Sequence, residues 1–330
     1  MINLLIIAEI IIVSFLSVLI LDNLAKKFAF FDRPNKTKIH KKIATNISGF
    51  GLFFLIINSF FLFDYSDQIN YSLNILIFFI FIGLFDDIKN LGASSKLFLM
   101  IIPTVMFIQE VGLVTSLGKY ENFTLNLNSL SMIFTFFSIL LLINAFNYID
   151  GMDGLLSTLS ISSLLFFLVI LPNTETKFIL PFILFLSIFL IFNLNLINLF
   201  SKIFIGNSGS IGIGFLFCII IIHYTQNQNF LHESTVIWFV AFVVYEFLTI
   251  NIIRIKDKKN PFKRDLNFIF NKMLKKYTKI KTLIICNSIN LLFCLIGYIF
   301  HIKKYYTFSI FLFIILFFIY LYFRLVQNKN

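Results

Sequence analysis

Long apolar runs separated by short polar stretches dominate this sequence. Eleven of these runs are candidates for membrane-spanning helices, because about 20 apolar residues suffice to cross a bilayer. The predicted spans are residues 2–22, 47–63, 71–85, 97–113, 129–146, 155–171, 178–196, 211–224, 234–253, 282–300 and 306–323. The pattern therefore predicts an all-α polytopic membrane protein with about eleven transmembrane helices, of which the eighth is the shortest.

The composition agrees with this pattern. A mean hydropathy of +0.92 and a charged fraction of only 13% exclude an ordinary soluble domain. Residues 2–22 lack a small-residue cleavage pattern, so we expect them to remain as the first helix. Cys218, Cys286 and Cys294 fall within predicted spans without the spacing of metal ligands, and we expect them to pack as apolar side chains.

Basic residues are distributed unevenly between the two sides of the predicted membrane. With the N-terminus outside, 23 of the 27 Lys and Arg residues fall in the inner loops or the C-terminal tail. Such an asymmetry is the positive-inside pattern and predicts an outside N-terminus and a cytoplasmic C-terminus. The net charge of +11 is then a matter of topology and attraction to anionic membrane lipids, with no nucleic acid implied.

Five polar motifs gather on this cytoplasmic side. They are "FDRPNKTKIH" (31–40), "FIGLFDDIKN" (81–90), "NAFNYIDGMDGLL" (144–156), "KIFIGNSGS" (202–210) and "NPFKRDLNFIF" (260–270). Acidic residues beside a bilayer are costly, which favours a functional interpretation. We therefore predict a single membrane domain, 1–330, whose site is formed by the cytoplasmic loops 23–46, 86–96, 145–155, 197–210 and 254–281.

The residue types in these motifs suit a divalent cation and phosphate. Four carboxylates on one face would repel one another unless a cation lay among them, and carboxylate and amide oxygens are ligands that suit Mg²⁺ together with substrate phosphates. Basic side chains in the same loops could hold phosphate oxygens. The candidates are Lys38, His40, Arg254, Lys263 and Arg264. Structural explanations stay open: paired acids can be solvated helix ends, and Asn and Asp often satisfy turn backbone.

Taken together, the motifs resemble those of the polyprenyl-phosphate N-acetylhexosamine-1-phosphate transferases, also called glycosyltransferase family 4. The resemblance is carried by "DRPN" with His40, by "FDD" (85–87), by "NYIDGMDGL" (147–155), by "SKIFIGNSGS" (201–210) with a preceding "FN", and by "PFKRD" (261–265) after Glu246 and Arg254. It spans nearly the whole chain, and the bacterial members that act on undecaprenyl phosphate look most similar.

The resemblance implies an enzyme that transfers a sugar 1-phosphate from a UDP-sugar to undecaprenyl phosphate and releases UMP. The expected partners are undecaprenyl phosphate, a UDP-N-acetylhexosamine and membrane lipids, and the expected cofactor is Mg²⁺, with Mn²⁺ as the alternative. The expected location is the bacterial inner membrane, with the active face cytoplasmic, at the first membrane step of a cell-envelope glycan pathway such as that of lipopolysaccharide O-antigen. The particular sugar, the pathway and a homodimeric state stay open.

The resemblance also assigns roles by position. Asp86 and Asp87 would hold the acceptor phosphate, with positioning favoured over base catalysis, and Asp150 and Asp153 would shape the nucleotide-sugar site. The implied metal ligands are Asn147 and Asn207, and the implied substrate-binding residues are Lys38, His40, Asn144, Ser208, Gly209, Arg264 and Asp265.

Three departures from the family pattern concern the site. Where the family has G-D-x-G-S, this chain has Asn207 in place of the metal-binding Asp. Where the family has a histidine cluster, the residues are Phe268, Ile269, Phe270 and Asn271, and Thr45 with Ser48-Gly49 replace a Pro and a Gly-Gly pair. These three departures keep a second hypothesis open, in which the chain is a weak or inactive family member that binds polyprenyl phosphate or nucleotide sugar. A transporter is disfavoured, because no charged residues line the spans toward the outer face.

Overall fold

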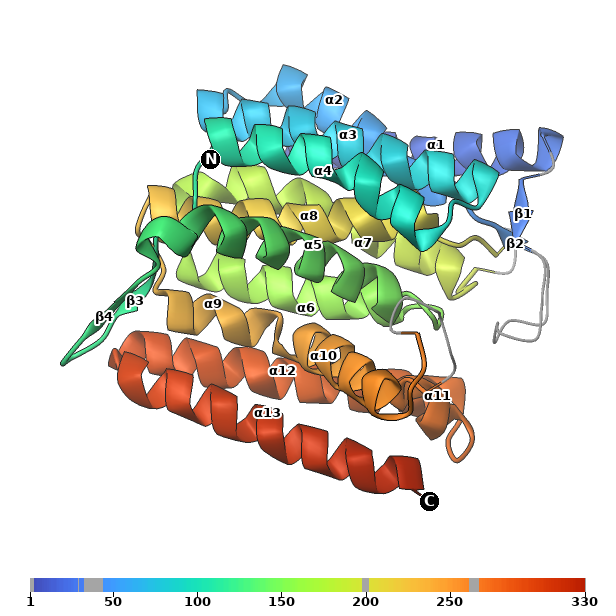
Figure 1. The fold of residues 1–330 in the computed structure, drawn as a ribbon. Coiled ribbons are helices and arrows are strands. Elements are labelled where there is room, and N and C mark those ends of the chain that lie inside the picture. The colour runs from blue at the N-terminus through green and yellow to red at the C-terminus, as the bar shows by residue number, and fades with distance from the viewer. Residues whose placement is uncertain (1–2, 29, 33–43, 198–201, 261–266, 330) are drawn as a thin grey trace.

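The structure is a computed structural model that describes residues 3–28, 30–32, 44–197, 202–260 and 267–329. Within these ranges the chain is a bundle of helices that lie side by side, with short strand pairs at its two ends (Figure 1). The helices are α1 Leu4–Lys27, α2 Gly51–Leu62, α3 Asp67–Lys89, α4 Ala93–Glu110, α5 Ser131–Ile149, α6 Leu155–Ile170, α7 Thr176–Asn193, α8 Gly206–Ile222, α9 Glu233–Phe239, α10 Ala241–Lys256, α11 Ile269–Leu274, α12 Lys279–Lys303 and α13 Tyr306–Lys329.

The strands form two antiparallel pairs. β1 (Phe31–Asp32) pairs with β2 (Ala44–Thr45), and β3 (Ser116–Lys119) pairs with β4 (Thr124–Asn126). These pairs were not predicted, because each is too short to show a strand pattern in the sequence.

The predicted polytopic membrane protein is confirmed. In the described part of the chain, eight helices are long and apolar enough to cross a membrane. The predicted span 234–253 is instead a pair, α9 and α10, bent by 75°, and the predicted spans 47–63 and 155–171 correspond to shorter apolar helices. A count of eleven spans, and the outside N-terminus, stay predictions.

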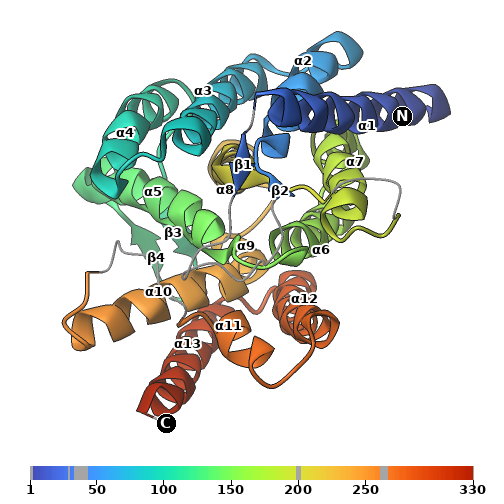
Figure 2. The same ribbon diagram turned by 90° about the vertical axis from the view of Figure 1, so that its right-hand side faces the viewer.

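Helix α8 is the centre of the bundle. Viewed end-on in Figure 2, helices α1 to α7 surround it. Of its most apolar stretch 94% is buried, against 11% for α13 at the edge. Glycines allow this close packing: a Cβ on Gly83 of α3 would lie 2.5 Å from the backbone of Ser208, and one on Gly214 would lie 2.8 Å from the Ile143 Cα of α5. The glycine-rich composition of 206–214 therefore serves a buried, closely contacted helix.

Helix α8 also begins earlier than the sequence pattern predicted. Residues 206–210, which we expected in the loop 197–210, form its first turn, and a π-helical turn at His223–Asn227 extends its far end. A hydropathy pattern did not predict the first turn as helical, because several of its residues are polar. Its polar side chains are consequently held by a helix that is packed on all sides.

The bend between α9 and α10 lies where the sequence has no Pro or Gly. Val240 takes a non-helical conformation with φ of −119°. The Ser163 hydroxyl on α6 donates a hydrogen bond of 2.6 Å to the Phe239 carbonyl, which satisfies a backbone group that the break frees. In a membrane interior such a neighbour is required for a broken helix, so the bend depends on tertiary contacts.

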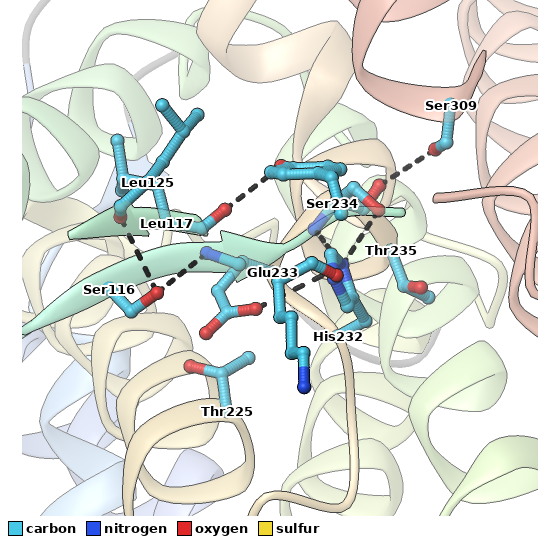
Figure 3. Close-up of polar contacts among 12 residues, drawn as sticks. Ser116, Leu117, Leu125, Thr225, His232, Glu233, Ser234, Thr235 and Ser309 are labelled. Carbon is cyan, nitrogen blue, oxygen red and sulfur yellow. Dashed lines mark hydrogen bonds and ion pairs between the residues drawn. The ribbon is translucent and has the colours of Figure 1, made fainter. Parts of the chain in front are cut away.

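The end of the bundle that carries β3 and β4 is closed by polar contacts (Figure 3). The Gln226 side chain accepts a hydrogen bond from the Thr115 N–H at 3.0 Å and donates one to Glu233 at 2.9 Å. The His232 ring stacks on Tyr306 with centroids 3.9 Å apart, and its Nε2 lies 3.1 Å from the Lys119 carbonyl oxygen. These contacts tie the hairpin to α9 and α13.

Candidate active site

The candidate site lies at the opposite end of the bundle, where α3, α5 and α8 meet. The paired acids lie in the last turn of α3, which ends at Lys89 because Asn90 takes a left-handed conformation (φ 52°) that Asn tolerates well. Asp86 is buried, forms an ion pair of 2.5 Å with Lys96 of α4, and accepts a hydrogen bond of 2.8 Å from the Leu91 N–H. Its carboxylate therefore links the end of α3 to α4 and to the turn between them.

Asp87 caps the N-terminus of α8. Its Oδ1 accepts hydrogen bonds from the Asn207 backbone N–H (2.8 Å) and from the Asn207 side-chain amide (3.0 Å), and its Oδ2 accepts one from the Ser208 N–H (3.0 Å). The first N–H groups of a helix have no partners within the helix, and its dipole favours a negative charge there. Asp87 thus holds the first turn of α8 from a helix 120 residues earlier in the chain.

Gly206 makes this approach feasible. It has φ of +71°, which an L side chain adopts only with strain, and a Cβ would lie 1.9 Å from the Asn46 carbonyl oxygen and 2.6 Å from Asp87 Oδ2. Glycine is therefore required at the entrance to α8.

The amide of Asn207 joins Asp87 to Asn147. While its Nδ2 donates to Asp87, its Oδ1 accepts a hydrogen bond of 2.8 Å from Asn147 Nδ2, which also donates to the Ser210 hydroxyl at 2.8 Å. We call Asp87, Asn147 and Asn207 the polar junction. The sequence predicted that these three residues share one site, and the structure brings them together from α3, α5 and α8.

Other predicted residues lie around the polar junction. Asn144, one turn before Asn147, donates a hydrogen bond of 2.7 Å to the Leu140 carbonyl of its own helix. Ser208 and Gly209 are buried in the first turn of α8, where Gly209 packs against Gly49. Asp150 is the C-cap residue of α5. The structure places these residues; their roles stay predictions.

The predicted residues Lys38, His40, Arg264 and Asp265 lie outside the described residues, as does Lys263. The roles that the sequence assigns to them stay predictions as well.

Asn193, the Asn of the "FN" pair, connects two loops of the site. Its Oδ1 accepts a hydrogen bond of 2.6 Å from the Gly154 N–H, and its Nδ2 donates one of 2.7 Å to the Ile203 carbonyl. It therefore fixes the loop after α5 to the segment before α8. The motif pointed to this residue, but no sequence pattern showed which two loops it joins.

The segment before α8 is also held by Thr45, which departs from the family pattern, and by Gly49, which keeps it. The Phe204 N–H donates to the Thr45 carbonyl (2.7 Å), and the Gly49 N–H donates to the Ile205 carbonyl (2.9 Å). The Thr45 hydroxyl in turn donates a hydrogen bond of 2.8 Å to Asp22 of α1. Thr45 and Gly49 thus keep a structural function at this end of the bundle.

Two lysines that the sequence analysis did not select approach the loop after α5. Lys202 and Lys279 both form ion pairs with Asp153, whose side chain is 9% exposed. Burial lowers the pKa of Lys202 below its usual value. Lysines are frequent in the loops predicted to be cytoplasmic, where they contribute to the predicted orientation. Only their contact with Asp153 distinguishes Lys202 and Lys279 from the others.

Aromatic rings occupy the place of the expected histidine cluster. The buried Phe268 and Phe270 rings stack with centroids 5.3 Å apart. The buried Arg254 guanidinium lies 5.4 Å from the Tyr148 ring centroid and 5.8 Å from that of Phe268, distances at which a cation is attracted by an aromatic face. Here the departure from the family pattern gives a packed aromatic cluster around a cation.

A buried ion pair holds this aromatic segment. Glu246 and Arg324 have no exposed side-chain surface and lie 3.0 Å apart. Glu246 accepts a hydrogen bond of 2.6 Å from the Ile269 N–H and another from the Tyr320 hydroxyl, and Arg324 donates one of 2.5 Å to the Asn267 carbonyl. Helix α13 is thereby attached to the start of α11 and to the segment next to the site.

The described residues contain no group of three or more His, Cys, Asp or Glu side chains suited to a metal ion. The polar junction nevertheless combines one carboxylate with two amide side chains, and oxygen donors of this kind fit Mg²⁺ when phosphates and water supply the remaining ligands.

The comparisons with known proteins show similarity to one family. The model of glycosyl transferase family 4 matches residues 69–225, a segment that includes Asp87, Asn147 and Asn207. The chain is 29% identical over 292 residues to the undecaprenyl-phosphate alpha-N-acetylglucosaminyl 1-phosphate transferase of Thermotoga maritima, with 87% of each chain covered. It is 27% identical over 266 residues to the protein of that name from Escherichia coli strain K12, with 76% of this chain and 71% of the relative covered. The chain is therefore similar to glycosyl transferase family 4 over residues 69–225, and to relatives that carry this transferase name over most of its length.

Proposed function

We propose that this protein transfers an N-acetylhexosamine 1-phosphate from a UDP-sugar to undecaprenyl phosphate and releases UMP. The observation that carries the proposal is the polar junction, in which Asp87, Asn147 and Asn207 meet at the N-terminus of the central helix. Together with the relatives named for this reaction, this arrangement favours a site that binds phosphate and a cation.

The reaction needs little proton transfer. An oxygen of the lipid phosphate attacks the phosphorus that carries the sugar, a new P–O bond forms, and the bond to the bridging oxygen of the diphosphate breaks, so that UMP leaves with that electron pair. Phosphoryl transfer depends mainly on positioning and on stabilisation of charge. The polar junction contributes to positioning, since the start of α8 holds Asp87 beside Asn207 and Asn147 through hydrogen bonds.

Asp86 and Asp87 act by positioning in this proposal. Asp86 is engaged with Lys96, and both oxygens of Asp87 accept hydrogen bonds from the start of α8. An acceptor phosphate is already ionised near neutral pH, because the second pKa of a phosphate monoester is about 6. A carboxylate base is therefore not required.

Asn147 and Asn207 would hold a divalent cation, Mg²⁺ or Mn²⁺, with ligands completed by substrate phosphates. The cation, when bound, supplies charge neutralisation for the diphosphate as UMP leaves. The Asn207 amide bridges Asp87 and Asn147 through hydrogen bonds, which fixes the two amide side chains relative to each other. Asp150 and Asp153, in the loop after α5, would border the nucleotide-sugar site.

The proposal includes a topology. Eleven spans, with the N-terminus outside, would place the polar junction on the cytoplasmic side of a bacterial inner membrane, where UDP-sugars are found. The distribution of Lys and Arg supports this orientation, as does the grouping of the end of α3, the end of α5 and the start of α8 at the end of the bundle opposite β3 and β4 (Figure 1).

A second candidate function is a family member that binds polyprenyl phosphate or nucleotide sugar with little or no turnover. Two observations favour it: the neutral Asn207 in place of a carboxylate, and the packed Phe268 and Phe270 in place of histidines.

One assay separates the two functions. Purified protein in detergent is mixed with undecaprenyl phosphate, Mg²⁺ or Mn²⁺ and a panel of UDP-sugars, and UMP release is followed. The transferase hypothesis expects UMP with at least one UDP-N-acetylhexosamine and only in the presence of both substrates. The absence of UMP with every sugar, for the natural chain and for Asn207→Asp, would refute it in favour of a binding protein.

A further inference from the structure

Two lysines share one carboxylate beside the polar junction. Lys202, which precedes α8, and Lys279, the first residue of α12, both pair with the Oδ2 atom of Asp153. The Lys202 side chain is 24% exposed and that of Lys279 is 42% exposed. Two ammonium groups around a single carboxylate leave an excess of positive charge at a partly buried position.

The positions of both lysines are unfavourable for a cation without a further anion. Lys279 stands at the N-terminus of a 25-residue helix whose first turn has no acidic residue, and the positive end of a helix dipole repels cations. Burial lowers the pKa of Lys202, which shows that desolvation disfavours its charged form. A second anion at this place would relieve both costs.

The excess charge borders the proposed reaction site. Asp153 belongs to the loop that follows α5, and Asn147 lies in the last turn of that helix. Lys202 lies five residues before Asn207, and the intervening segment is fixed by the hydrogen bonds of Thr45 and Asn193. The pair therefore contacts the loop that follows Asn147, and Lys202 belongs to the segment that leads to Asn207.

We propose that Lys279, together with Lys202, is an anion-binding pair that exchanges Asp153 for a phosphate group of a substrate. The chemistry it recognises is a phosphate or diphosphate oxygen, supplied by the nucleotide sugar or by the polyprenyl phosphate. The inference rests on the proposed function, and it assigns a phosphate-binding role to Lys279, which lies outside the motifs that carry the family resemblance.

The test compares Lys279→Gln with Lys281→Gln. Lys281 is exposed in the same turn of α12, so its substitution removes one charge without touching Asp153. Lys279→Arg keeps the charge and serves as the conservative variant. Because Lys279 is 42% exposed, we expect all three variants to keep the melting temperature of the natural chain.

Binding and kinetics are measured separately on the purified full chain. UDP and a short-chain polyprenyl phosphate are each titrated without the other substrate, and KM and kcat are determined for both substrates. Loss of a charge-assisted hydrogen bond weakens binding roughly tenfold to one hundredfold. We expect this loss in Lys279→Gln alone, with KM changed more than kcat and with binding largely restored in Lys279→Arg.

The titrations distinguish the two possible sources of the phosphate group. Weaker binding of UDP alone assigns the pair to the diphosphate, and weaker binding of the lipid alone assigns it to the acceptor phosphate. If Lys279→Gln binds both ligands as tightly as Lys281→Gln does, the inference is overturned. If the natural chain releases no UMP, the transferase proposal fails, and the titrations without turnover still decide whether Lys279 binds phosphate.

Discussion

The substitution Asn207→Asp tests how the polar junction replaces the carboxylate that the family pattern expects. In the structure, the Asn207 Nδ2 atom lies 3.0 Å from Asp87 Oδ1 and donates a hydrogen bond to it. Aspartate at this position would put an oxygen where the nitrogen now lies. The donor would be lost, and two carboxylates would face each other across about the same distance.

The repulsion can be estimated from that distance. Two unit charges about 3 Å apart repel by about 5 kcal/mol at an effective dielectric constant of ~20. A carboxylate can escape by taking up a proton, which for an ordinary aspartate costs about 4 kcal/mol at pH 7. The smaller figure sets the upper limit, so without a cation we expect Asn207→Asp to lower the free energy of unfolding by up to about 4 kcal/mol.

A divalent cation should reverse most of this loss. Binding to the folded state alone at one hundred times the dissociation constant restores about 2.7 kcal/mol. The assay is thermal unfolding in detergent, in EDTA and in a series of Mg²⁺ concentrations. We expect the variant to melt several degrees below the natural chain in EDTA and to gain more from Mg²⁺ than the natural chain does.

The control for this experiment is Asn195→Asp. Asn195 is exposed in the segment that follows α7, so the change adds the same charge away from the polar junction. If Asn207→Asp is as stable as Asn195→Asp in EDTA and responds no more strongly to Mg²⁺, then the hydrogen bond from Asn207 to Asp87 does not stabilise the polar junction.

Two further substitutions test the framework of the site. Gly206→Ala should destabilise the fold and abolish turnover, because the added Cβ would lie 1.9 Å from the Asn46 carbonyl oxygen at a φ of +71°. In a thermal scan, the control Gly92→Ala should melt as the natural chain does, because open space surrounds its Cβ. Arg324→Met should lower the free energy of unfolding by about 3–5 kcal/mol, since it leaves Glu246 charged and buried without its partner. Urea unfolding should show that adding Glu246→Gln recovers part of this loss. Full additivity of the two changes would contradict a direct interaction between the two side chains.

The sequence predicted the elements of this fold better than their ends. Apolar runs located the helices because a bilayer demands a minimum apolar length. The bend at Val240 was missed, since it depends on the Ser163 hydroxyl of another helix and leaves no Pro or Gly in the sequence. The start of α8 was also missed, because its first turn obtains its caps from Asp87 in α3, far away in the chain.

In the candidate site, too, some residues could be predicted from the sequence and others could not. Asp87, Asn147 and Asn207 could be predicted as neighbours because residues of their types are costly beside a membrane and their motifs share one side of it. Lys202 and Lys279 could not, because the chain has 27 Lys and Arg residues and the orientation rule by itself accounts for most of them. What separates these two is a common contact with Asp153, and such a contact exists only after α5, α8 and α12 have packed. A lysine in a membrane protein therefore becomes a candidate for substrate binding when it shares one carboxylate with a second cation. By the same criterion Lys96 is not a candidate, because it pairs alone with Asp86 and leaves no excess positive charge for a ligand.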